Sequence, residues 1–259
     1  MEERVQARFE GHVAFLELTG RSGTNPMDER FVRDLDHVAA SIADAVRERR
    51  SDVVVMRALG RHFCVGGDLS DLARAEDPPA SMRHMTGFAH RGIAALHALE
   101  VPVIAAWQGA AAGGGIGLVL AADIVVASRS ASMIAGYSAV GLSPDAGVSW
   151  GLARRLGPVR ALDLLLSNRR LDSDAIVALG LAAEVVDDDD LDARVSELVD
   201  RILEVGGSVV RTTKHLVRQA ESVALETQLE AEAKGIAAAS AGDRFTAAVA
   251  AYAGGAHAD

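Results

Sequence analysis

The stretch Val101–Ser128, VPVIAAWQGAAAGGGIGLVLAADIVVAS, decides the fold class. It carries no charged residue before Asp123, and a run of about 20 apolar residues is long enough to cross a bilayer. Pro102, Gln108 and five glycines nevertheless divide it into a buried strand, a loop and the start of a helix. A strand that runs through glycines into a helix is typical of an α/β protein.

The same alternation extends to both sides of this stretch. Short apolar and β-branched runs predict strands at Val5–Phe9, Val13–Leu18, Val53–Leu59, Val103–Trp107, Ile124–Ala127 and Glu184–Val186. Helical patterns separate most of them, at Met27–Arg49, Ser81–Leu99, Ala146–Leu156, Val159–Leu166 and Ser173–Leu179. Gly157 and Gly180 stand where helices end. We therefore expect parallel strands joined by crossover helices.

The pattern changes after Asp190. Apolar residues keep a helical spacing from Leu191 onward, and no further strand-like run follows. We predict an α/β core over residues 1–190 and an all-helical region over residues 191–259, which caps the core or binds another subunit. The acidic run Asp187–Asp190 suits the start of the first of these helices, where carboxylates complement the helix dipole.

Charge and cysteine content exclude several classes of protein. The formal net charge is -10, so a general nucleic-acid or anionic-membrane surface is not expected. Cys64 is the only cysteine, which indicates a reducing, cytoplasmic environment, and the start MEERVQARFEG lacks the apolar core of an export signal. No motif indicates a metal or a redox cofactor.

Two glycine-rich segments are candidates for binding an anion or an oxyanion. HFCVGGDL (62–69) and GAAAGGGIGL (109–118) each follow a strand and precede a helix. Glycine lets a ligand approach the backbone, and a helix start offers free N–H groups and a partial positive charge. Neither segment has the GxGxxG pattern and later acidic residue of a dinucleotide site. The alternative is that the glycines serve only close packing.

Taken together, these segments resemble the crotonase superfamily, also called the enoyl-CoA hydratase and isomerase family. HFCVGGDL is similar to its first oxyanion motif, VPVIAAWQGAAAGGGIGL with Asp123 to its second, and GLSPDAGVSWGLARRLG (141–157) to the segment that supplies a catalytic carboxylate. Asn25 and TTKHL (212–216) are weaker similarities. The resemblance implies a right-handed ββα spiral, a C-terminal helical region, and assembly as a homotrimer or a dimer of trimers.

The resemblance also implies roles for particular residues. The backbone amides of Val65 and Gly114 would form an oxyanion hole for a thioester. Coenzyme A would enter as part of the substrate, with no other cofactor, and would contact Ala58, Gly60, Asp68 and Leu69. The segment from Asp77 to His90, which contains two prolines, is expected to be an irregular, mobile loop that lines the acyl pocket.

The chain departs from the hydratase pattern, in which two glutamates activate a water. Gly117 and Tyr137 stand at the matching positions. Asp145 remains as the expected acid and base, and a single carboxylate favours double-bond isomerisation over hydration. The alternative for Asp145 is that it only caps the following helix.

The remaining polar residues leave alternatives open. Tyr137 could donate a hydrogen bond to the substrate or to Asp145, although a wall of the acyl pocket is the favoured role. His90 resembles a histidine of the 4-chlorobenzoyl-CoA dehalogenase branch, whose tryptophan is replaced here by Tyr137. Dehalogenase-like hydrolysis with Asp145 and His90 is one alternative, and binding of acyl-CoA without catalysis is another. A nucleotide-dependent dehydrogenase ranks last. Cys64 is expected to be a packing residue.

Overall fold

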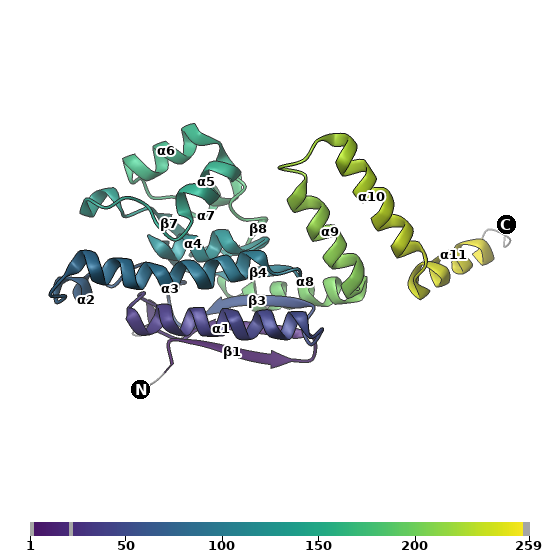
Figure 1. The fold of residues 1–259 in the computed structure, drawn as a ribbon, viewed down its shortest axis with the longest axis horizontal. Coiled ribbons are helices and arrows are strands. Elements are labelled where there is room, and N and C mark those ends of the chain that lie inside the picture. The colour runs from purple at the N-terminus through teal and green to yellow at the C-terminus, as the bar shows by residue number, and fades with distance from the viewer. Residues whose placement is uncertain (1–2, 21–22, 256–259) are drawn as a thin grey trace. The chain divides into compact units, whose positions relative to one another are not determined.

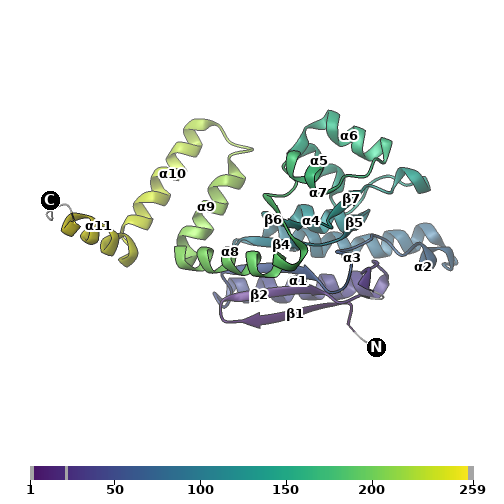
Figure 2. The same ribbon diagram turned by 180° about the vertical axis from the view of Figure 1, so that it is seen from behind.

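A computed structural model describes residues 3–20 and 23–255. Its main sheet has six strands in the order β1-β2-β3-β4-β6-β8. The antiparallel β1–β2 pair forms one edge, seen in Figure 2, and the remaining pairs are parallel. The strands are β1 (Val5–Glu10), β2 (Val13–Leu18), β3 (Val53–Ala58), β4 (Val103–Trp107), β6 (Ile124–Ser128) and β8 (Glu184–Val186).

Helices connect the parallel strands, as such strands require. Helix α1 (Glu29–Arg47) joins β2 to β3, and α2 (Leu69–Ala73) and α3 (Pro78–Ala98) join β3 to β4. Figure 1 shows α1 and α3 side by side along the sheet. The apolar face of α1 is buried from Phe31 to Val46 at helical spacing, so burial of this face fixes the helix against its neighbours.

A second, smaller layer of backbone pairing positions the loops. Strands β5 (Ala110–Ala112) and β7 (Ser132–Ile134) form a parallel pair. Single bridges join Met27 to Gly67, Cys64 to Ala111 and Met133 to Leu171. These strands and bridges are too short to show an apolar period, so the sequence does not predict them. They hold the two glycine-rich segments side by side.

Helix α4 (Gly114–Ala121) is entirely buried and starts within the second glycine-rich segment. Helices α5 (Val148–Leu156), α6 (Pro158–Ser167) and α7 (Ser173–Ala178) follow, with short 3₁₀ turns at Ser138–Val140 and Asp188–Asp190. Gly157 adopts a positive φ between α5 and α6, and Gly180 does so just after α7, so both glycines end helices as predicted.

The predicted strands are confirmed to within one residue at each end. The expectation of an irregular loop from Asp77 to His90 was wrong, because α3 begins at Pro78. Proline is well suited to the first turn of a helix, where its missing N–H has no partner to lose, and the Asp77 carboxylate caps the turn by accepting the Ala80 N–H at 3.0 Å. The two prolines therefore start a helix.

The C-terminal region is helical, with α8 (Leu191–Val205), α9 (Gly207–Gln219), α10 (Leu225–Ser240) and α11 (Asp243–Gly255). Two compact units divide within α8, the first ending at Arg201 and the second starting at Ile202. In the second unit, α9 and α10 form a hairpin in which Gln228 donates to the Leu216 carbonyl at 3.1 Å. A functional division at residue 190 stays a prediction. No helix of the described residues is long and apolar enough to cross a membrane.

Candidate active site

The two glycine-rich segments meet backbone to backbone. The Cys64 N–H donates to the Ala110 carbonyl at 3.2 Å, and the Ala112 N–H donates to the Cys64 carbonyl at 2.9 Å. Gly66 has φ of 84°, and a Cβ there would lie 2.7 Å from the Ala112 oxygen. Both the positive φ and the close contact require glycine at this position.

The Asn25 side chain fixes the start of the first glycine-rich segment, HFCVGGDL. Its side chain is fully buried, accepts the Gly20 N–H at 2.7 Å and donates to the carbonyls of Leu59, His62 and Phe63. Asn25 itself has φ of 51°, a left-handed conformation that asparagine tolerates better than most residues. One buried amide thus joins three separate pieces of backbone, which gives the weak similarity at Asn25 a structural meaning.

Val65 does not offer a free amide. Its N–H donates to the Thr24 carbonyl at 3.2 Å, which contradicts its expected role as the first oxyanion donor. Two residues further on, Gly67 forms a parallel bridge with Met27. The hydrogen bonds of this bridge come from the residues on either side of Gly67, because the Met27 N–H donates to the Gly66 carbonyl and the Asp68 N–H donates to the Met27 carbonyl. This pairing leaves the Gly67 N–H unused, and a Cβ on Gly67 would meet nothing within 4 Å. Gly67 is exposed at an open place in the structure.

Gly114 is the first residue of α4, where backbone N–H groups have no acceptor inside the helix. Within the described residues, neither Gly67 nor Gly114 donates its N–H to another protein group. The two segments touch beside these amides, because a Cβ on Gly113 would lie 3.7 Å from the Gly66 Cα. Gly114 was predicted from the sequence as a donor and Gly67 was not, although the paired glycines of HFCVGGDL are a signal for it.

Asp145 is held by Tyr137. The phenol donates to Asp145 Oδ1 at 2.7 Å, so the alternative of a hydrogen bond to Asp145 is the one that the structure shows for Tyr137. Burial and the neighbouring Asp145 charge raise the Tyr137 pKa far above its ordinary value, which keeps the phenol protonated as a donor. Asp145 does not cap α5, because Gly147 is the N-cap residue and no side chain bonds to that helix start.

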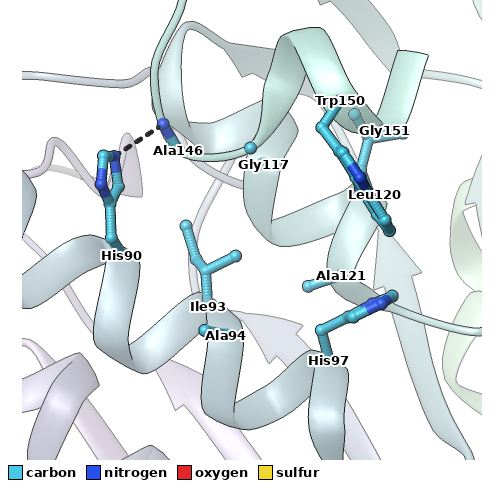
Figure 3. Close-up of a pocket in the computed structure, with 11 residues that line it drawn as sticks. His90, Ile93, Ala94, His97, Gly117, Leu120, Ala121, Ala146, Trp150 and Gly151 are labelled. Carbon is cyan, nitrogen blue, oxygen red and sulfur yellow. Dashed lines mark hydrogen bonds between the residues drawn. The ribbon is translucent and has the colours of Figure 1, made fainter. Parts of the chain in front are cut away.

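His90 contacts the same loop from α3. Its Nε2 accepts the Ala146 N–H at 3.1 Å, as Figure 3 shows, which requires a neutral ring with the proton on Nδ1. Ala146 has φ of 52°, an uncommon conformation for alanine that is held here by its neighbours. A Cβ on Gly114 would lie 3.6 Å from the Ala146 Cβ, so the loop with Asp145 adjoins the free amide at the start of α4.

Gly117 faces the same loop. A Cβ at this position would lie 2.1 Å from the Ala146 carbonyl oxygen, so the backbone of the Asp145 loop fills the space that a side chain would need. The position that matches a hydratase glutamate therefore has no room for one in this arrangement. Cys64 is buried, and burial raises its pKa to about 12, which leaves it a protonated packing residue as expected.

The residues predicted to contact coenzyme A lie at the end of β3 and the start of α2. The carbonyls of Ala58 and Gly60 accept hydrogen bonds from Gln108 Nε2 at 2.6 and 3.2 Å. Asp68 caps α2 by accepting from Ser70, and the resulting hydrogen bonds lower the Asp68 pKa. Leu69 is half exposed. Among the described residues, no three His, Cys, Asp or Glu side chains are grouped so that they could hold a metal ion.

Comparison with known proteins identifies the family. The family model for enoyl-CoA hydratase/isomerase matches residues 8–256. The chain belongs to the enoyl-CoA hydratase/isomerase family. Its mixed α/β core with a mostly parallel sheet and a C-terminal helical region is the fold expected for the crotonase superfamily.

Relatives within this family carry out different reactions. A 1,2-epoxyphenylacetyl-CoA isomerase of Escherichia coli (strain K12) is 34% identical over 205 residues, 76% of this chain and 78% of the relative. A 4-chlorobenzoyl coenzyme A dehalogenase of an Arthrobacter species is 29% identical over 221 residues, 81% of this chain and 80% of that one. Membership of the family therefore establishes the kind of enzyme, and the site must decide the reaction.

One similar solved structure contains an acyl-CoA ligand. The protein of Thermobifida fusca YX, assigned as an enoyl-CoA hydratase and solved in complex with acetoacetyl-CoA, has a TM-score of 0.82 to this chain. The two are 28% identical, and the match covers 92% of this chain and 95% of that one.

Proposed function

We propose that this protein isomerises the double bond of an enoyl-CoA thioester, with the Gly67 and Gly114 amides binding the thioester oxygen and Asp145 acting as acid and base. One observation carries the proposal. The loop that holds Asp145 lies against Gly114, and the Gly114 and Gly67 N–H groups both lack protein acceptors within the described residues. A carboxylate on a loop that adjoins one unused amide, with a second unused amide on the neighbouring segment, is the combination that thioester enolate chemistry needs.

The reaction balances with these groups alone. Asp145 takes a proton from the α-carbon, and the electron pair moves onto the thioester oxygen, which the two amides stabilise. The enolate then recovers the proton at the γ-carbon, and the double bond moves into conjugation with the carbonyl. Each amide donor contributes about 3 to 4 kcal/mol to stabilising such an oxyanion. The carboxylic acid formed in the first step returns a proton, either the one it removed or one exchanged with solvent, so no second acid is required.

Hydration is less well supported by the site. The position that would carry one glutamate is Gly117, which packs against the Ala146 backbone, and the other is Tyr137, whose phenol is already bonded to Asp145. Of the positions that match the hydratase pattern or its surroundings within the described residues, Asp145 alone therefore offers a carboxylate to activate water. The Tyr137 hydrogen bond orients this carboxylate, which suits a group that must move a proton between two carbons.

The test compares Asp145→Asn with Asp163→Asn. The second variant removes an exposed carboxylate of α6 that pairs with Arg169. Proton exchange of enoyl-CoA esters in heavy water, followed by mass, reads the chemistry. We expect Asp145→Asn to slow exchange by several orders of magnitude with CoA-ester affinity retained, and Asp163→Asn to match the wild type. Full exchange in Asp145→Asn would remove this carboxylate from the mechanism. Binding without exchange in the wild type would instead favour a non-catalytic acyl-CoA-binding protein.

A second candidate is dehalogenase-like hydrolysis of an aryl-CoA. It is favoured by the hydrogen bond that places His90 beside the Asp145 loop. Here the Asp145 carboxylate would attack the halogenated ring carbon and expel the halide. His90 Nε2 would then exchange the Ala146 N–H for a water molecule and take a proton from it, and this water would cleave the aryl ester and restore the carboxylate. Release of chloride from 4-chlorobenzoyl-CoA, lost in both Asp145→Asn and His90→Gln, would support this reaction over isomerisation.

We further propose a cytoplasmic enzyme that uses no cofactor beyond the coenzyme A of its substrate and assembles as a homotrimer or a dimer of trimers. A stripe of exposed apolar side chains on α6 supports a protein partner, because Val159 is 80%, Leu162 57% and Leu166 71% exposed. Light scattering of the wild type and of Leu166→Glu tests this assembly, and a monomeric wild type would contradict it.

A further inference from the structure

An apolar pocket of about 340 Å³ lies between α3, α4 and α5. Ile93 and Ala94 line it from α3, and Leu120 and Ala121 line it from α4. Figure 3 shows His90 at one end and the His97 and Trp150 side chains at the other. Pockets of this size are typical of sites that bury a small organic ligand.

The pocket is continuous with the proposed catalytic loop. His90, which accepts the Ala146 N–H, lines it, as do Ala146 and Gly117. Ala146 also lies against Gly114. Ala146 is therefore shared between the lining of this pocket and the surroundings of the Gly114 amide. From His90 to His97 the pocket follows α3 for about 10 Å, at 1.5 Å per residue.

Between the two ends, the described residues that line the pocket carry no polar side chains. Glycine is required at 117 by the Ala146 carbonyl. At 151 a Cβ would lie 3.0 and 3.1 Å from Leu120 side-chain atoms, a tight contact to which Leu120 would have to adjust slightly. At the far end the His97 and Trp150 rings meet edge to face with centroids 5.1 Å apart. A polar acyl group here would leave its hydrogen-bonding groups without partners along the walls, which is costly, whereas an apolar group would gain burial.

We infer that this pocket receives the outer part of the acyl chain, so that the substrates are CoA esters of apolar acyl groups longer than four carbons. This inference rests on the proposed function for the position of the thioester. Ala94 and the His97–Trp150 pair then determine the chain length accepted. Short or hydroxylated acyl groups leave the pocket unfilled or desolvate their polar atoms, and bind less tightly.

Binding of saturated esters tests the pocket without any need for catalysis. Calorimetry would compare butanoyl-, hexanoyl- and octanoyl-CoA with the wild type, Ala94→Trp and Ala40→Trp. Ala94 and Ala40 are both exposed helical residues, so either tryptophan can be accommodated, but only Ala94 lines the pocket. Burying one methylene is worth about 0.8 kcal/mol, which is roughly a fourfold gain in affinity per carbon.

We expect octanoyl-CoA to bind the wild type and Ala40→Trp on the order of a hundredfold more tightly than butanoyl-CoA. Ala94→Trp should remove most of this difference. Equal affinity for all three esters in the wild type, or an unchanged difference in Ala94→Trp, would overturn the inference. Proton exchange with 3-octenoyl-CoA in heavy water separates the two proposals. Exchange without any chain-length dependence of binding refutes the pocket alone, and chain-length dependence of binding without exchange refutes the proposed function alone.

Discussion

Adding one methyl group at Gly117 should disturb the site more than it helps the helix. In Gly117→Ala the new Cβ would lie 2.1 Å from the Ala146 carbonyl oxygen and 2.9 Å from the Ala146 Cβ. A backbone carbonyl cannot rotate away as a side chain can, so the loop with Asp145 must shift. Overpacking costs about 1 to 3 kcal/mol, and replacing a helical glycine returns about 1 kcal/mol. Because the contact is with backbone, we expect the overpacking cost to be near 3 kcal/mol, so that the free energy of unfolding falls by about 2 kcal/mol.

The matched control is Gly87→Ala in α3. A Cβ there would meet only Arg91 Nη1 at 3.8 Å, so this variant should gain about 1 kcal/mol from helix propensity alone. Thermal unfolding by circular dichroism reads both changes, at about 2 to 4 °C per kcal/mol for a protein of this size. Gly117→Ala should also lose thioester proton exchange, because the His90–Ala146 hydrogen bond moves with the loop. If both variants gain stability equally and exchange persists, the Ala146 carbonyl does not restrict residue 117 to glycine.

Two further predictions concern Tyr137 and Cys64. Tyr137→Phe removes the 2.7 Å hydrogen bond to Asp145, and hydrogen bonds to charged groups are worth about 1.5 to 3 kcal/mol. We therefore expect kcat to fall roughly ten- to hundredfold with little change in KM. Steady-state kinetics that show an unchanged kcat would contradict this. The Cys64 pKa is raised from 9.0 to about 12, so the unfolded chain releases this proton first and stability should decline as the pH rises between these values. Urea denaturation of the wild type and Cys64→Ala checks it, since the variant should lose that part of the pH dependence.

Much of the architecture could be predicted because burial imposes a period on the sequence. The strands β2, β4 and β8 were predicted to the residue. For β4, which is a fully buried central strand with parallel neighbours, the reason is that both of its faces are apolar. Strands β5 and β7 have three residues each, too few for any pattern to emerge. The segment after Asp77 was mistaken for a loop because proline disrupts the interior of a helix but favours its first turn.

The site was predictable in its residue types but not in its hydrogen bonds. Gly114, Asp145, Tyr137 and His90 were all identified from the motifs, and the structure connects the last three through one loop. The error at Val65 has a simple origin. Whether a backbone N–H is free depends on what the neighbouring strand accepts, and the acceptor of the Val65 N–H, Thr24, is 41 positions earlier in the sequence. Nothing in HFCVGGDL indicates that pairing.

The side chain of Asn25 also constrains the order in which the chain can fold. Its acceptors lie 34 to 38 residues further along, so the first glycine segment cannot become ordered until β3 has been made and has paired with β2. Forming contacts between residues so far apart in the sequence first costs the entropy of closing a long loop, and proteins dominated by such contacts fold slowly. During synthesis, the amide of Gly67 would therefore acquire its orientation late. The β1–β2 hairpin and α1 would be made first and would remain unpaired with β3 until that strand has been synthesised.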